Sequence, residues 1–250
     1  MLAAEDGDEV AGNKLGNELL GFHGIEYILF ENGAPKTASS ITDDELIYAV
    51  AVAGDLRNRT AQLDVAWRGD KAPEARVEAG EEVLELNTTV NGGMYYGENL
   101  LAAGNAGSTF SSWSHAMQAI LSSCSDICDE VGTSKIGKAH NNEDITYIES
   151  PYSQNSITDF YDNITSIANV YYGGIQGKRV ESKSLHNWMS ANAADVDKEI
   201  VEAIDNALAK IKAMKAPFVT YYDDASCDDA MDACSALDDA IGKAITAVAN

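Results

Sequence analysis

"LLGFHGIEYILF", residues 19–30, is an apolar stretch interrupted by two polar side chains. Ten of its twelve residues are apolar or glycine, and the exceptions, His23 and Glu26, stand three apart. A helical residue turns by about 100°, so these two side chains lie on one face. The pattern predicts an apolar helix over residues 12–30, ended by the asparagine, glycine and proline within residues 32–35. A helix that is apolar all round is buried, and we therefore expect both polar groups to be at least partly buried.

The His23–Glu26 pair has three chemical interpretations. The two groups can hydrogen-bond to each other or to a neighbouring helix, bind a metal ion, or act as an acid and a base, because a buried carboxylate without a partner is unfavourable. Gly21 and Gly24 on either side of His23 would let a neighbouring backbone or a ligand approach closely. A glycine inside a helix costs about 1 kcal/mol relative to alanine, which indicates a packing or functional reason. The second histidine of the zinc-peptidase helix motifs is missing, so a zinc hydrolase would need further ligands from elsewhere.

The rest of the chain also predicts helices. Thr42 and Glu45 have capping-box spacing at the start of a helix over residues 42–67. Glycine-rich breaks make residues 68–107 an irregular excursion. Four further helical segments follow, at residues 108–131, 156–173, 193–214 and 226–249.

Two of these four segments have predicted N-caps, Ser156 and Ser226, each with an acidic residue in the first turn. The third segment has a core-facing apolar stripe with helical spacing. Its members are Val196, Ile200, Ala203, Ile204, Ala207 and Ile211. The sequence therefore predicts an all-α fold of two helical bundles, with residues 1–107 in the first and residues 108–250 forming a second, four-helix bundle.

A second polar cluster precedes the helix at 156–173. Glu149, Ser150, Ser153 and Asn155 crowd into a loop held by Pro151. One interpretation is simple capping of the following helix, whose first N–H groups lack partners. The other is that this loop completes a site with His23 and Glu26.

Composition limits the class of partner. The 250 residues include 17 basic and 40 acidic ones, for a net charge of −23. This charge argues against nucleic acid or an anionic membrane surface as partner and favours cations, metal ions included. No apolar run approaches the roughly 20 residues that span a bilayer, and the opening "MLAAEDGDEV" does not have the pattern of a signal peptide.

The four cysteines form two pairs, Cys124 with Cys128 and Cys227 with Cys234. One interhelical disulfide in an oxidising compartment and four free buried thiols are both compatible with this spacing. A zinc site is less favoured, because neither pair has the CxxC spacing.

Gly21, His23 and Glu26 form a GxHxxE motif, and the chain resembles the imelysin family, also called the insulin-cleaving membrane protease family. Three further stretches resemble that family in the same order along the chain. They are "DLRNRTAQLDVAW", "ICDEVGTSKIGKA" and "IESPYSQNSITDFYDNITSIANVYYG". Two features depart from the family pattern. Pro151 stands where many members have arginine, and only 20 residues precede the motif where members usually have a longer segment.

The resemblance implies two helical bundles related by a pseudo-twofold axis, with the motif near their interface. The short leading segment would leave the first bundle incomplete. We therefore expect an N-terminal segment or a partner chain to cover residues 15–30.

The resemblance also implies a bacterial protein of the cell envelope, either periplasmic or a surface lipoprotein, linked to iron-regulated uptake. We expect noncatalytic binding of a metal ion, iron or zinc, or of an iron-containing ligand. His23 and Glu26 would be the metal ligands, and Gly21, Gly24, Glu149, Ser150, Ser153 and Asn155 would line the site. A metallopeptidase that uses the GxHxxE motif and a structural helical scaffold are the alternatives, so the sequence leaves open whether the chain is an enzyme.

Overall fold

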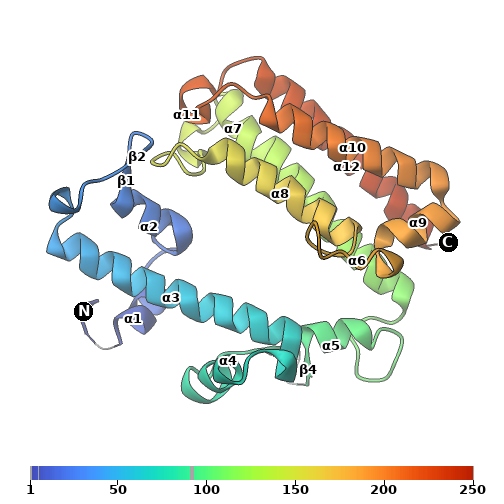
Figure 1. Ribbon diagram of the computed structural model, residues 1–250, viewed down its shortest axis with the longest axis horizontal. Helices are drawn as coiled ribbons and strands as arrows, with labels where there is room; N and C mark the ends of the chain where they lie inside the picture. The colour runs from blue at the N-terminus through green and yellow to red at the C-terminus, as the bar shows by residue number, and fades with distance from the viewer. Residues whose placement is uncertain (1, 5, 91–92, 250) are drawn as a thin grey trace. The chain divides into compact units, whose positions relative to one another are not determined.

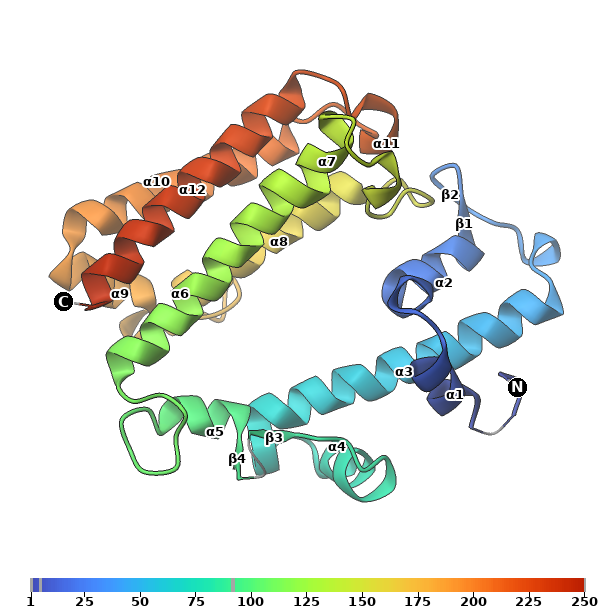
Figure 2. The ribbon, with the colours of Figure 1, turned by 180° about the vertical axis from the view of Figure 1, so that it is seen from behind.

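The computed structural model describes residues 2–4, 6–90 and 93–249. The described chain is all-α, with strands only as two short antiparallel hairpins (Figures 1 and 2). Its contacts divide it into two compact units, unit 1 up to Ala116 and unit 2 from Met117. A domain boundary at residue 107 remains a prediction. None of the helices in the described ranges is both long and apolar enough to cross a bilayer.

Unit 1 is built on one long helix, α3, Asp43–Arg68. Its other α-helices are α1 Gly7–Lys14, α2 Gly21–Leu29, α4 Glu74–Val77 and α5 Tyr96–Leu101. Its hairpins pair β1 Phe30–Glu31 with β2 Ala34–Pro35, and β3 Thr89–Val90 with β4 Met94–Tyr95. Short 3-10 turns occupy Asn17–Leu19, Ala38–Ser40 and Gly69–Lys71, and a π-helical turn occupies Glu78–Val83.

The predicted capping box starts α3. The backbone N–H of Thr42 donates to Glu45 Oε2 at 2.8 Å, and the N–H of Glu45 donates to Thr42 Oγ1 at 3.3 Å. These bonds satisfy helix-end donors that would otherwise lack partners. The prediction of a helix over 42–67 is confirmed to within one residue at each end.

The predicted helix over residues 12–30 is wrong in its first half. Helix α1 ends at Lys14, and Leu15 and Gly16 are extended, with ψ of 148° and 154°. Leu20 is extended as well, and Gly21 begins α2 with a φ of +68°. Apolar spacing persists across this break, so periodicity alone could not reveal it. The predicted end is confirmed, because α2 stops at Leu29 and the chain turns through residues 32 and 33.

Unit 2 is a bundle whose long helices are α6 Trp113–Asp129, α8 Ser156–Tyr171, α10 Ala194–Lys212 and α12 Ser226–Ala249 (Figures 1 and 2). Helix α6 starts within the last residues of unit 1. The predicted stripe on α10 lies in the core, where Ile200, Ile204 and Ile211 are at most 1% exposed. Phe160 and Phe218 pack edge to face there with ring centroids 5.2 Å apart.

Shorter elements complete unit 2. They are the π-helical turn η5 Glu130–Ile136, α7 Gly137–His140, α9 Leu185–Asn192, α11 Phe218–Tyr221 and 3-10 turns at Ile145–Tyr147 and Glu181–Lys183. The turn η5 joins α6 to α7 without ending the helix.

The two predicted N-caps are wrong. Ser156 and Ser226 are the first residues of their helices rather than the residues before them. The hydroxyl of Ser156 donates to the carbonyl of Glu149, and the hydroxyl of Ser226 donates to Asp224 Oδ1 at 2.9 Å. Both hydroxyls therefore fix the preceding loop instead of capping the helix.

Candidate functional site

His23 and Glu26 lie together on α2. His23 Nδ1 is 3.2 Å from Glu26 Oε2, which is hydrogen-bonding distance. The imidazole side chain is 48% exposed, whereas the glutamate side chain is 9% exposed. The structure thus pairs a solvent-facing ring with a buried carboxylate.

Helix α2 is not buried all round, which corrects the expectation from its composition. Gly24, Glu26 and Ile28 are its buried residues, whereas Phe22 is 72% and Tyr27 is 52% exposed. The short helix packs against α3 along one side, so apolar side chains on its other side stay in solvent. His23 lies with these exposed residues.

The two glycines that flank His23 position the helix in different ways. Gly21 has a φ of +68°, which residues with a Cβ rarely adopt, and a Cβ there would meet no atom within 4 Å. A Cβ on Gly24 would lie 2.6 Å from the carbonyl oxygen of Leu19 and 3.0 Å from the hydroxyl of Tyr48. Tyr48 of α3 donates a hydrogen bond to that same carbonyl. Gly24 therefore serves the close packing of α2 on α3.

Glu149 of the second predicted cluster is paired with a lysine. Lys135 Nζ lies 3.0 Å from Glu149 Oε1, 2.8 Å from Glu149 Oε2 and 2.9 Å from Asn163 Oδ1. Both charged side chains are less than 20% exposed. Lys135, which belongs to η5, is not among the residues predicted for this site. A signal was available, because it is the first lysine or arginine after Arg76.

The rest of that loop is fixed by its own conformation. Ser150 is 6% exposed and has a φ of +48°, a conformation that is uncommon for serine. Asn155 stands at the N-cap position of α8, and its Nδ2 donates to Asp159 Oδ1 at 3.3 Å. Ser153 is half-buried in the same loop.

The predicted site residues fall in both units. Gly21, Gly24 and the His23–Glu26 pair belong to unit 1, and residues 149–155 belong to unit 2. Each group is formed within its own unit. A single site that combines the two groups stays a prediction.

The donor set fits a metal ion only in part. Among residues 2–4, 6–90 and 93–249, no group of three or more histidine, cysteine, aspartate or glutamate side chains is arranged to hold a metal ion. His23 and Glu26 offer two donors, whereas a zinc centre uses about three or four protein ligands. A metal bound there would take its remaining ligands from water or from a larger ligand.

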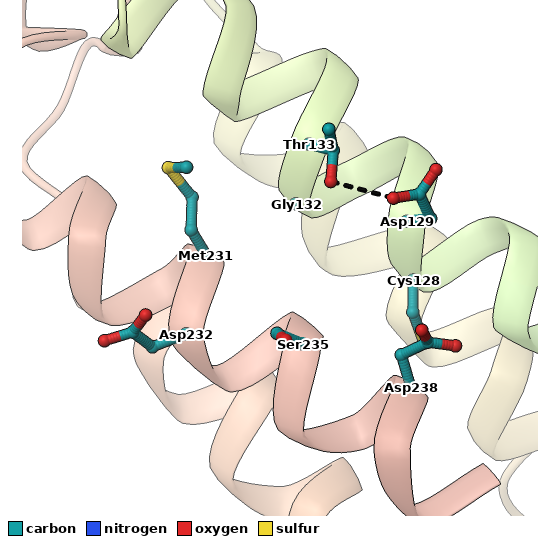
Figure 3. A pocket seen from close by; sticks show the side chains of 8 residues that line it. All are labelled: Cys128, Asp129, Gly132, Thr133, Met231, Asp232, Ser235 and Asp238. Carbon is teal, nitrogen blue, oxygen red and sulfur yellow. Dashed lines mark hydrogen bonds between the residues drawn. The ribbon is translucent and has the colours of Figure 1, made fainter. Parts of the chain in front are cut away.

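The cysteines are free and buried thiols on α6 and α12. Cys128 lines a surface cavity of about 210 Å³ between these helices (Figure 3). Burial raises the pKa of Cys128, and the neighbouring Cys234 and Asp238 raise it further. Thr133 donates to Asp129 Oδ1 at 2.8 Å on the rim of this cavity. The Cys128 thiol is therefore neutral, which suits packing rather than nucleophilic or metal chemistry.

Comparisons place the whole chain among known proteins. The family model for imelysin (Peptidase_M75) matches residues 2–245. The crystal structure of a candidate iron-regulated protein A precursor from Parabacteroides distasonis is 23% identical, with a TM-score of 0.72, over 98% of this chain and 70% of that one. An imelysin peptidase from Bacteroides ovatus is 27% identical, with a TM-score of 0.63, over 77% of this chain and 51% of that one. No curated protein matches the sequence. Because the family model spans nearly the full length and both solved structures share the fold, this chain belongs to the imelysin family.

Proposed function

We propose that this chain is a noncatalytic protein of the bacterial cell envelope that binds a metal ion or an iron-containing ligand through His23 and Glu26. The observation that carries the proposal is the pairing itself. A half-exposed imidazole stands 3.2 Å from a buried carboxylate. A ligand that arrives from solvent meets the ring first. A metal ion bound by both side chains would replace the Nδ1–Oε2 hydrogen bond with one bond to each of these atoms.

Charge and family support a cationic ligand. The net charge of −23 raises the local concentration of cations around the protein. Imidazole and carboxylate are donors that suit ferrous iron and zinc alike. Membership of the imelysin family, with a structural relative named as a candidate iron-regulated protein precursor, supports a role in iron uptake and a location in the periplasm or as a surface lipoprotein.

Metal titration of the purified chain tests the proposal. Calorimetry with ferrous iron and with zinc should show one site in the wild type, and His23→Ala and Glu26→Gln should each weaken binding by at least about tenfold. His140→Ala is the matched control, because it removes the imidazole of another histidine–carboxylate pair, His140 with Asp228. Equal metal affinity in the His23→Ala variant and the wild type would contradict the proposal.

A metallopeptidase is the second candidate, because one structural relative is named an imelysin peptidase. Glu26 would then serve as the general base. Cleavage of an unfolded protein substrate that is abolished both by Glu26→Gln and by a metal chelator would support this candidate. A purely structural pair predicts instead that His23→Ala lowers the thermal midpoint and leaves metal affinity unchanged.

We also propose that a further segment or a partner chain covers residues 15–30. Leu19 is 45%, Phe22 is 72% and Tyr27 is 52% exposed, and a group of neighbouring exposed apolar side chains marks an interaction surface. A Phe22→Ser variant should weaken or abolish that association without lowering the free energy of unfolding of the chain alone. Hydrogen exchange of α2 that is the same in the isolated chain and in the intact envelope would argue against such a cover.

A further inference from the structure

A second histidine is oriented by a buried carboxylate in unit 2, far along the sequence from His23. His186 Nδ1 lies 2.7 Å from Asp197 Oδ1, and the hydroxyl of Tyr171 donates to the same oxygen at 2.6 Å. Asp197 is 8% and Tyr171 is 2% exposed. Burial, together with the bond to Asp197, raises the pKa of Tyr171. The phenol therefore stays protonated and keeps the carboxylate fixed.

This arrangement leaves one ring nitrogen of His186 available. A neutral imidazole has one N–H and one lone pair, and Asp197 accepts from Nδ1. Nε2 then carries the lone pair, and it has no hydrogen-bond partner within the part of the chain that the structure describes. The His186 side chain is 37% exposed. Carboxylate–imidazole pairs of this kind orient metal-ligating histidines and make the ring a stronger donor.

The number of donors restricts the kind of metal that such a ring can bind. Within the described ranges, His186 is not part of any group of three or more side chains able to hold a metal ion. A bare ion would gain one protein ligand there. A metal that already carries a chelating ligand needs only one more donor at its open axial position.

The segment beside His186 is basic, in contrast to the acidic composition of the whole chain. Residues 173–184, GGIQGKRVESKS, contain Lys178, Arg179 and Lys183 against a single acidic residue, in a protein of net charge −23. The Arg179 guanidinium lies 4.4 Å from the centroid of the Tyr172 ring, and that ring meets the imidazole of His186 edge to face at 5.3 Å. The backbone N–H of Val180 donates to the carbonyl of Gly173 at 3.0 Å, so this segment folds back on itself.

Exposed aliphatic side chains complete this surface. Val170 at the end of α8 is 44% exposed, and Ile175 and Val180 in the folded segment are 54% and 51% exposed. Two carboxylates, Asp197 and Asp205, lie close enough to Tyr172 to raise the pKa of its hydroxyl. Residues 170–186 thus contain an oriented imidazole, exposed apolar side chains and several cations.

We propose that His186 is the axial ligand of an anionic, hydrophobic metal chelate, of which an iron porphyrin is the representative class. The ring nitrogen binds the iron, the aliphatic side chains contact the macrocycle, and Lys178 and Arg179 pair with its carboxylates. Asp197 is a positioning residue that acts through His186. This site uses different residues from the His23–Glu26 pair and does not depend on the function proposed for them.

Titration of the full chain with hemin, followed by the Soret band, tests the inference. We expect a one-to-one complex with a shifted band in the wild type and none with His186→Ala. Added imidazole should restore co-elution of hemin with the His186→Ala chain on gel filtration, because a free ligand replaces the lost ring; the band shift alone does not report this rescue, since imidazole also binds free hemin. His140→Ala is the control, since both ring nitrogens of His140 already have partners, the Tyr222 carbonyl and Asp228. Asp197→Asn should still bind hemin but raise the reduction potential of the iron, because the ring becomes a weaker donor.

The outcomes separate this inference from the function proposed above. Hemin binding that survives in His186→Ala but is lost in His23→Ala would overturn the inference and favour the His23–Glu26 site. A Soret band that does not shift when hemin is added to the wild-type chain would also overturn the inference. If His186→Ala does not fold, as judged by circular dichroism, the variant Lys178→Glu decides. Lys178 is exposed, and Arg179, which packs on Tyr172, is left unchanged. An affinity equal to that of the wild type would refute the proposed surface, whereas a loss of about tenfold or more supports it.

Discussion

Two glycines in helices provide a matched test of the packing around the GxHxxE segment. Gly24 lies in α2 and Gly242 lies in α12. Replacement of a helical glycine by alanine gains about 1 kcal/mol from backbone propensity. A Cβ on Gly242 meets no atom within 4 Å, so Gly242→Ala should stabilise unit 2 by about this amount.

The same change at Gly24 should have the opposite sign. Its Cβ would stand 2.6 Å from the Leu19 carbonyl oxygen, which is backbone, and 3.0 Å from the Tyr48 hydroxyl. Forced overpacking costs about 1–3 kcal/mol. The propensity gain is common to both variants, so the difference between them isolates this steric cost. We expect Gly24→Ala to destabilise unit 1 by up to about 2 kcal/mol.

Urea unfolding measures both variants, with amide hydrogen exchange to assign each change to a unit. Exchange data are needed because a chain of two compact units need not unfold in one transition. A Gly24→Ala variant that is stabilised as much as Gly242→Ala would refute the inference that α2 packs on α3 through this glycine.

Two further predictions concern unit 2. Ile204→Ala should lower the free energy of unfolding by about 2–5 kcal/mol, because the side chain is 1% exposed. Ile145 is 56% exposed, so Ile145→Ala should change the free energy of unfolding by less than about 0.5 kcal/mol in the same urea series. Similar losses in the two variants would contradict the assignment of Ile204 to the core. Burial raises the pKa of Cys124 and Cys227 to about 11 and that of Cys234 to about 12, from an ordinary value of 9.0. Above about pH 9 the unfolded chain therefore binds fewer protons than the folded one, and the free energy of unfolding should fall as the pH rises toward 11–12. Cys234→Ala should make that fall shallower, and an unchanged pH dependence would show that this thiol is not buried.

Local sequence signals predicted some parts of the fold well. The Thr42–Glu45 box marked the start of α3, because both partners lie within one turn and need no distant residue. The apolar stripe on α10 was also predictable, since helical spacing alone decides which side chains share a face. The end of α2 followed from the turn residues that come after it.

Features that depend on distant contacts could not be predicted in this way. The break between α1 and α2 involves Leu15 and Leu20, whose apolar side chains continue the helical spacing even though their backbones are extended. The exposure of Phe22 and Tyr27 depends on which helices lie beside α2, and composition does not contain that information. The partner of Glu149 is Lys135, fourteen residues earlier, and its approach depends on the helix that carries it.

The π-helical turn Glu130–Ile136 gives this segment one residue that a regular α-helix would not need. A π-helical turn holds one more residue than an α-helical turn, and each complete turn returns the following side chains to the same direction. Removal of one residue within the π-helical turn would therefore leave a continuous α-helix in which His140 still faces Asp228, whereas removal of one residue from the regular part of α6 would rotate the side chains beyond it by about 100°. A gap at the π-helical turn in an alignment of relatives is thus compatible with the His140–Asp228 contact, and a gap within α6 identifies a chain in which that contact is rebuilt or lost.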